Sequence, residues 1–302
     1  MKQFSVTWDV TKEQEGMLLR NFLTEEHNIS RRLLTDIKFH GGKIEVNGQH
    51  VTVRYELRAG DHVTITFPKE ERSMAMQPYA LSLEVVFEDE HILVVNKPAG
   101  LATIPSRKEP NISLAQGVLA YYDLHQIPAT IHIVTRLDRD TSGLVLVAKH
   151  RYAHSLLSKQ QIAKQIERYY VAIVEGLLHR RKGTITLPIA RKASSIIERT
   201  VDILGQEAIT HFETMGQSEN HTLVKIKLET GRTHQIRVHF SAIGHSLAGD
   251  KLYGGSIEHI SRQALHCTTL SFQHPFTKET ITLTSKFPRD MCSMIERMEF
   301  FR

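Results

Sequence analysis

The spacing of apolar residues divides the chain into two patterned regions, the first spanning residues 1–68. Helical spacing and strand alternation predict four elements here: 18–23, 31–37 with Ser30 as its cap, 44–46 followed by the turn Asn47-Gly48, and 63–67. Helices and strands mixed over so short a region indicate a small α/β domain.

The second region, residues 83–302, is richer in strands. Alternation and short apolar runs predict strands at 83–87, 92–95, 144–148, 169–175, 183–189, 207–214 and 221–229. Helical spacing predicts helices at 113–124, 151–163 and 289–299, and a shorter one capped by Thr233 and running to Ala242. The irregular order indicates an α+β fold with a mixed sheet, and not a regular alternation of strands and helices.

Composition changes between the two regions. Residues 69–82 carry a run of charges followed by Met, Pro and Ser, as a linker does. We therefore expect a small domain over 1–70, a linker over 71–82 and a larger domain over 83–302.

The charge and the cysteines narrow the class of protein. A net charge of +5 suits a polyanionic partner without demanding one. Cys267 and Cys292 have no zinc or disulfide spacing, which favours a reducing cytoplasm. The first residues do not form a signal peptide, and no apolar run of about 18 residues predicts a membrane span.

The most unusual segment is 135–149, where charged and hydrogen-bonding residues precede an apolar strand. Gly143 is expected to form a tight turn there, and a loop at the mouth of a sheet often carries chemistry. Spacing alone leaves a solvated, charged turn as the alternative. Tyr170 lies on one face of a predicted strand, where a core aromatic is the ordinary interpretation.

A second candidate segment is 229–239, which joins a strand to a helix. Arg232 and Arg237 would lie near the helix N-terminus, a position that suits anions. The alternative is a structural turn with surface arginines. His234 and His239 are five residues apart and do not align as metal ligands, so no metal site is expected.

Several kinds of enzyme machinery are missing from the sequence. It has no Walker loop, no Rossmann glycine fingerprint, no HExxH motif and no Gly-x-Ser-x-Gly elbow. An enzyme with this sequence would have to use a carboxylate without a metal or a bound cofactor.

Four ordered motifs resemble the RluA/RluD family of RNA pseudouridine synthases: NKPAG at 96–100, RLDRDTSG at 136–143, YVAIVEG at 170–176 and GRTHQIRVH at 231–239. The resemblance covers nearly all of 83–286. It implies a mixed, mainly antiparallel sheet with flanking helices, and an isomerase of RNA uridine that needs no metal, nucleotide or other cofactor.

The resemblance also implies site residues. Asp138 would be the catalytic carboxylate, either as a nucleophile toward the sugar or as a base that takes the 2′ proton. Arg237 would be its ionic partner, with Arg232 as second choice. Tyr170, also catalytic, would stack on uracil and help to remove the C5 proton late in the reaction. Arg136 would fill the space left by the flipped base, and Lys97 would contact the RNA.

Residues 1–68 resemble, more loosely, the small alpha-L RNA-binding domain that often precedes this catalytic domain. The resemblance implies that Arg31, Arg32 and Lys38 face RNA phosphates, with a solvated helix face as the alternative. Two departures from the catalytic pattern stand out. Thr135 replaces the family's usual His before Arg-Leu-Asp, and Arg168 replaces a usual Lys.

The expected function is isomerisation of specific uridines in structured RNA. Ribosomal RNA of the large subunit is favoured and transfer RNA is the second choice; a monomer is the default. A non-catalytic RNA-binding or ribosome-assembly protein is the alternative from another class. A hydrolase that uses Asp138 as nucleophile would instead release free uracil.

Overall fold

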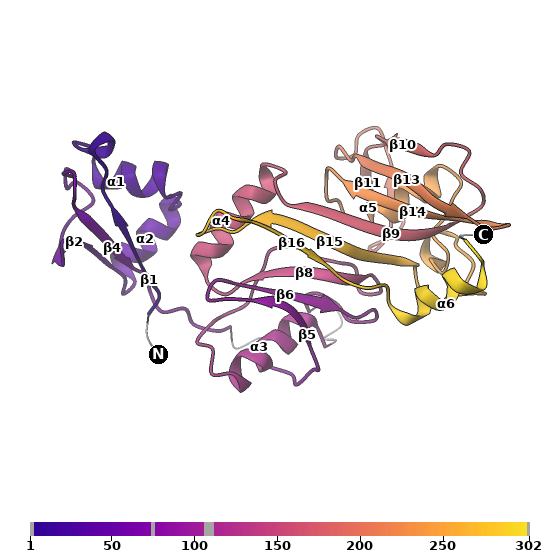
Figure 1. Cartoon of the computed structure of the whole chain (residues 1–302), viewed down its shortest axis with the longest axis horizontal. Coiled ribbons are helices and arrows are strands. Elements are labelled where there is room, and N and C mark those ends of the chain that lie inside the picture. Colours follow the sequence, from indigo (N-terminus) through magenta and orange to yellow (C-terminus); the bar gives the residue numbers. More distant parts are fainter. Residues whose placement is uncertain (1–2, 74–75, 106–111, 301–302) are drawn as a thin grey trace.

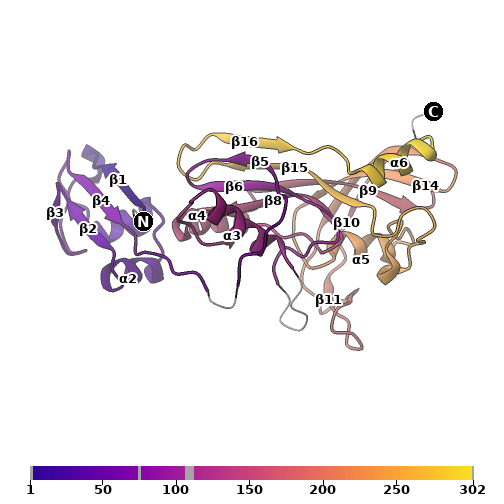
Figure 2. The same ribbon diagram turned by 90° about the horizontal axis from the view of Figure 1, so that it is seen from below.

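The computed structural model describes residues 3–73, 76–105 and 112–300 (Figure 1). It has the predicted α+β fold, with a small N-terminal sheet and a large sheet that carries most of the chain. Figures 1 and 2 place the small sheet at one end of an elongated molecule.

The small sheet has four antiparallel strands in the order β1-β4-β2-β3: β1 Ser5–Asp9, β2 Lys43–Val46, β3 Gln49–His50 and β4 His62–Thr66. Around it lie η1 Lys12–Gln14, α1 Leu19–Asn21, the π-turn η2 Phe22–Glu26 and α2 Arg31–Phe39. The predicted cap is confirmed, because the Leu33 N–H donates to Ser30 Oγ at 3.2 Å. Asn47 and Gly48 have φ of 54° and 78°, as the predicted tight turn requires.

The large sheet has ten strands, eight of them in the order β10-β13-β14-β9-β15-β8-β6-β5, with β16 on β15 and β7 on β8. Their bounds are β5 Glu84–Glu88, β6 Ile92–Lys97, β7 His132–Ile133, β8 Ser142–Ala148, β9 Glu167–Glu175, β10 Lys182–Ile185, β13 Thr210–Gln217, β14 His221–Leu228, β15 Leu265–Gln273 and β16 Thr280–Thr284. Within the described residues, β8 and β15 form the one parallel pair of this sheet. The prediction of a mixed, mainly antiparallel sheet is confirmed.

The predicted strand 183–189 is wrong in its extent. The chain leaves β10 after Ile185 and starts a separate hairpin, β11 Ile189–Arg191 and β12 Arg199–Val201. Pro188 lies between the two strands and has no N–H to donate to a sheet ladder, which explains the break. The hairpin projects from the body in Figure 2.

The larger helices follow their predicted ranges closely: α3 Leu114–Leu124, α4 Arg151–Ile162 and α6 Arg289–Arg297; the 3₁₀ turn η3 spans Lys251–Tyr253. The prediction that Thr233 caps the next helix is wrong, since α5 spans Gln235–Ala242 and follows His234, whose φ is 58°. The left-handed conformation of His234 changes the direction of the backbone directly before the helix. The helix has no side-chain cap, and the Gln235 side chain accepts the N–H of Arg232 in the preceding turn at 2.9 Å.

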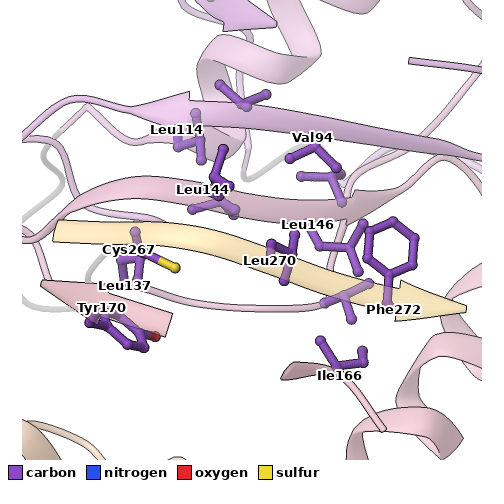
Figure 3. Packing of buried hydrophobic residues seen from close by; sticks show 14 of the residues in the cluster. Val94, Leu114, Leu137, Leu144, Leu146, Ile166, Tyr170, Cys267, Leu270 and Phe272 are labelled. Carbon is purple, nitrogen blue, oxygen red and sulfur yellow. The ribbon is translucent and has the colours of Figure 1, made fainter. Parts of the chain in front are cut away.

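The core of the large domain lies around β8, whose seven residues are all buried. Side chains from β6, β15 and α3 pack on both faces of this strand. Figure 3 shows Tyr170 at the edge of this cluster, beside Leu137 and Cys267. The loop that precedes β8 is therefore attached to a fully buried strand.

Gly143 does not form the tight turn expected from the sequence. It lies inside β8 with φ of 116°, opposite Cys267 of the parallel strand β15. A Cβ built on Gly143 would lie 2.3 Å from the Cys267 carbonyl oxygen. Glycine is needed here because two backbones approach closely at the end of the loop that carries Asp138.

The small sheet and the helices around it, residues 5–66, pack against α4 and are called the N-terminal sheet domain below. The Tyr152 hydroxyl donates to the His27 carbonyl at 2.6 Å, and its ring stacks on Phe67 at 5.0 Å. Arg151 forms an ion pair with Asp36 at 3.2 Å. In the expected linker 71–82, of which 74–75 lie outside the described residues, the Arg72 Nε donates to the Ala129 carbonyl at 3.0 Å.

We predict that Gly143→Ala destabilises the fold by at least about 3 kcal/mol, because the new Cβ collides with backbone that cannot move aside. Gly244→Ala is the matched control: this glycine also has a positive φ, 84°, but its Cβ would meet nothing within 4 Å. The control should lose about 1–2 kcal/mol from backbone strain alone. Urea unfolding of both variants measures the difference, and equal losses would contradict the close-approach explanation.

Candidate active site

An open cleft of about 330 Å³ lies where the predicted motifs meet. Its lining comes from the loop before β8, from β9, from the turn before α5 and from the segment after β6. Among the residues on its wall are Ala102, Thr103, Arg136, Leu137, Asp138, Arg168, Tyr170, Arg232, His234 and Arg237. The fold thus brings together Arg136, Asp138, Tyr170, Arg232 and Arg237, which lie in separate motifs of the sequence.

The Asp138 loop is held by two buried threonines. Thr135 accepts the Leu146 N–H at 2.9 Å and so ties the loop to β8. Thr103 accepts the Leu137 N–H at 3.1 Å and donates to the Leu137 carbonyl at 2.7 Å. Thr135, which replaces the family's usual histidine, therefore anchors the loop, while the Asp138 side chain remains 25% exposed to the cleft.

Lys97, which was expected to contact RNA, is placed elsewhere. Its side chain is fully buried, and Nζ donates to the carbonyls of Pro98, Leu101 and Arg139 at 2.8, 2.7 and 2.9 Å. Burial lowers the pKa of Lys97 to about 7. Because its donors are already used and no surface is exposed, Lys97 ties the segment after β6 to the Asp138 loop instead of binding a ligand.

Arg237 joins two carboxylates. Its Nε and Nη2 donate to the buried Asp250 at 2.6 and 2.8 Å, and its Nη1 donates to Asp138 Oδ2 at 3.2 Å. Burial opposes the charged form of Arg237, but the hydrogen bonds and attraction to Asp250 and Asp138 outweigh burial and raise its pKa. The expected contact of Arg237 with Asp138 is present. Arg232 is exposed and donates instead to the Glu207 carbonyl at 2.9 Å.

Tyr170 is 3% exposed and lines the cleft from β9. Burial raises the pKa of its phenol. The ring is thus both a core aromatic and part of the cleft wall, whereas its stacking on uracil stays a prediction. A phenol that stays protonated is better suited to stacking than to taking a proton.

The remaining predicted site residues are exposed on the surface of the protein. Arg136 is exposed at the cleft, beside Asp138. Arg31, Arg32 and Lys38 are exposed on α2, in the N-terminal sheet domain. Figure 1 shows α2 and α5 in separate parts of the molecule, so these basic residues do not contribute to the cleft.

Two residues of this site, Asp250 and His234, were not predicted as site residues. No role was predicted for Asp250, although a buried arginine needs a buried counter-ion. His234 Nε2 lies 3.9 Å from Asp138 Oδ2, and His234 Nδ1 lies 2.8 Å from the Tyr253 hydroxyl. His234 was considered only as a metal ligand, and nothing in its spacing indicated that a left-handed turn aims its ring at Asp138.

The described residues hold no group of three or more His, Cys, Asp or Glu side chains that could bind a metal ion. None of the described helices is long and apolar enough to span a membrane.

We predict that Asp250→Asn destabilises the protein by about 3–5 kcal/mol, since it leaves the buried Arg237 without its main counter-charge. Asp290→Asn is the control, because Asp290 also binds an arginine through two hydrogen bonds but is 42% exposed. Its loss should cost less than about 1 kcal/mol. Thermal unfolding of the two variants checks the contrast; a larger effect at Asp290 would contradict it.

Comparisons with known proteins identify the family of this chain. Residues 91–242 match the family model of RNA pseudouridylate synthases. An uncharacterized RNA pseudouridine synthase of Bacillus subtilis, YjbO, is 49% identical over 90% of this chain and 96% of its own length. The ribosomal large subunit pseudouridine synthase D of Xylella fastidiosa is 34% identical over 88% of this chain and 84% of its own length.

A solved structure, human RNA pseudouridylate synthase domain containing 4, shares the fold with a TM-score of 0.60. It covers 72% of this chain and 93% of its own, at 20% identity. This solved structure shows only the shared fold, whereas the sequence relatives show the family. The chain belongs to the RluA/RluD-type family of RNA pseudouridine synthases and is an isomerase that converts uridine in RNA to pseudouridine.

Proposed function

We propose that this enzyme modifies specific uridines of ribosomal RNA, with the large subunit favoured, and that Asp138 carries the reaction. The main support is the placement of Asp138 in the cleft, with one carboxylate oxygen bound to Arg237. Relatives named as ribosomal large subunit pseudouridine synthase D support the substrate.

The reaction breaks the bond between ribose C1′ and uracil N1, turns the base and joins C1′ to C5. The proton displaced from C5 leaves, and N1 gains one, so the composition of the RNA is unchanged. Asp138 Oδ2 is held by Arg237, while Oδ1 accepts no hydrogen bond from the described residues. Oδ1 is therefore the oxygen available to attack C1′ or to take the 2′ proton.

The guanidinium of Arg237 lies 3.2 Å from the Asp138 carboxylate in the cleft and attracts its negative charge. At roughly 3–4 Å and an effective dielectric near 20, this attraction is of the order of 4 kcal/mol before desolvation is counted against it. Because Asp250 fixes the guanidinium in two places, the carboxylate of Asp138 is oriented before the substrate binds.

The target uridine must leave its helix or loop, which costs a few kcal/mol. We propose that Tyr170 recovers part of this cost by stacking on uracil, and that exposed Arg136 occupies the vacated space. Both side chains lie on the cleft wall beside Asp138.

The N-terminal sheet domain is proposed to be an alpha-L domain that grips RNA phosphates. Arg31, Arg32 and Lys38 are all exposed on α2, and apolar residues on its other face fill the domain core. Phosphate contacts of this kind position RNA without reading its sequence.

We predict that Asp138→Asn slows tritium release from RNA labelled at uridine C5 by at least about 10³-fold while the protein stays folded. In a strain lacking the enzyme, pseudouridine should disappear from particular ribosomal RNA positions and return with the wild type, but not with the variant. Asp140→Asn is the matched control, since Asp140 lies two residues away and its carboxylate pairs with exposed Arg139.

Three outcomes count against parts of this proposal. Normal tritium release by Asp138→Asn contradicts the catalytic assignment. Loss of pseudouridine from transfer RNA alone contradicts the substrate. Free uracil among the products would indicate a hydrolase.

We predict that the triple variant Arg31→Ala, Arg32→Ala and Lys38→Ala weakens binding to ribosomal RNA fragments and lowers the slope of log Kd against log salt by up to about 0.7–0.9 per lost contact. The rate with saturating RNA should change little, because the cleft lining includes no α2 residue and α2 lies apart from α5 (Figure 1). The control triple carries alanine at three exposed basic residues in or near α6: Lys286, Arg289 and Arg297. Equal effects of the two triples would show that general charge, and not α2, sets the affinity.

A further inference from the structure

His234 offers an unused hydrogen-bond donor to the cleft. Its side chain is 11% exposed and lines the cleft wall at the start of α5. Nε2 lies 3.9 Å from Asp138 Oδ2, which is too long for a hydrogen bond. Within the described residues this nitrogen has no hydrogen-bond partner, so it faces the space that the substrate must occupy.

The neighbours of His234 determine which nitrogen carries the proton. The Tyr253 hydroxyl accepts the Arg199 N–H at 2.9 Å and lies 2.8 Å from His234 Nδ1. If Tyr253 donates its proton to Nδ1, the Arg199 N–H, the Tyr253 hydroxyl and His234 Nδ1 each have a hydrogen-bond partner. The opposite assignment leaves the Tyr253 proton without an acceptor among the described residues.

The ring of His234 is neutral near pH 7. Burial lowers its pKa, and the charges of Arg237 and Arg199 act in the same direction, against Asp138 and Asp250. A neutral ring that accepts at Nδ1 carries its proton on Nε2. The Nε2–H group of His234 therefore faces the cleft beside the Asp138 carboxylate.

Building on the proposed role of Asp138, we propose that His234 Nε2–H donates to the 2′-hydroxyl oxygen of the target ribose and so positions the sugar. Asp138 acts at C1′ or on the hydrogen of C2′, whichever route it takes. The 2′ oxygen is bonded to C2′ and adjacent to C1′, so it must lie near the carboxylate. A donor 3.9 Å from that carboxylate fits this oxygen.

This contact would make His234 a specificity-determining residue. The 2′-hydroxyl is the group by which a protein distinguishes RNA from DNA at a given nucleotide. The backbone N–H of Arg199, at the start of β12, anchors Tyr253, so the β11–β12 hairpin holds the ring of His234 in place.

The test uses two substitutions that separate the donor from the fold. His234→Asn keeps a polar group near the Nδ1 position for Tyr253 and tolerates the left-handed φ of 58°, but has no atom at Nε2. His234→Gln places an amide N–H near Nε2. Both are made in the full chain with Asp138→Asn, so that binding is measured without turnover.

The ligands are two stem-loops that carry the uridine mapped in the deletion strain, one with uridine and one with 2′-deoxyuridine at that position. With His234 present, the deoxy substitution should raise Kd by about 3- to 10-fold, the effect of one hydrogen bond. With His234→Asn the two stem-loops should bind within about twofold of each other, because the partner of the hydroxyl is already gone. His234→Gln should restore part of the difference.

An equal deoxy effect with histidine and asparagine at position 234 would overturn the proposal. If His234→Asn does not fold, Tyr253→Phe tests the same contact, since it removes the proton that fixes the tautomer and should reduce the deoxy effect. Tritium release by the wild type from the uridine stem-loop is measured separately. If the wild type releases no tritium, the proposed function fails. If release is normal but the deoxy substitution raises Kd equally with histidine and asparagine at position 234, only the proposed His234 contact is ruled out.

Discussion

The candidate active site depends on one buried guanidinium shared by two carboxylates. A buried arginine costs several kcal/mol in desolvation unless its donors are satisfied and its charge is balanced. Asp250 meets both needs with two hydrogen bonds from a side chain that is almost fully buried, which leaves Arg237 Nη1 to orient Asp138. The carboxylate in the cleft is therefore positioned by a partner that is itself fixed, as preorganised catalysis requires.

The loop that carries Asp138 is rigid for reasons unrelated to its charge. Thr135 and Thr103 hydrogen-bond its neighbours to β8 and to the segment after β6, and the Lys97 ammonium binds the Arg139 carbonyl from within. Gly143 lets β8 approach β15 directly after the loop. A polar loop at the edge of a fully buried strand thus keeps one geometry while its Asp138 and Arg136 side chains face the cleft.

The N-terminal sheet domain is docked, not loosely tethered. Tyr152 and Leu156 of α4 belong to the same apolar cluster as the core of that domain. Since α4 follows directly from β8, the basic face of α2 and the cleft are attached to one framework. RNA bound by α2, as proposed, would reach the cleft in a restricted orientation. The proposed phosphate contacts would therefore orient the RNA without recognising its sequence.

The sequence by itself determined the fold class, most element positions, the family and the pair of Asp138 and Arg237. These follow from local periodicity, from cap and turn residues such as Ser30 and Asn47, and from motifs that lie in short contiguous segments. Tertiary structure decided what depends on distant neighbours. Lys97 is buried because three carbonyls converge on it, Gly143 is needed because β15 lies against it, and His234 faces Asp138 because a left-handed turn aims its ring there. Burial and cross-chain contact have no local signature, so sequence spacing could not assign these roles.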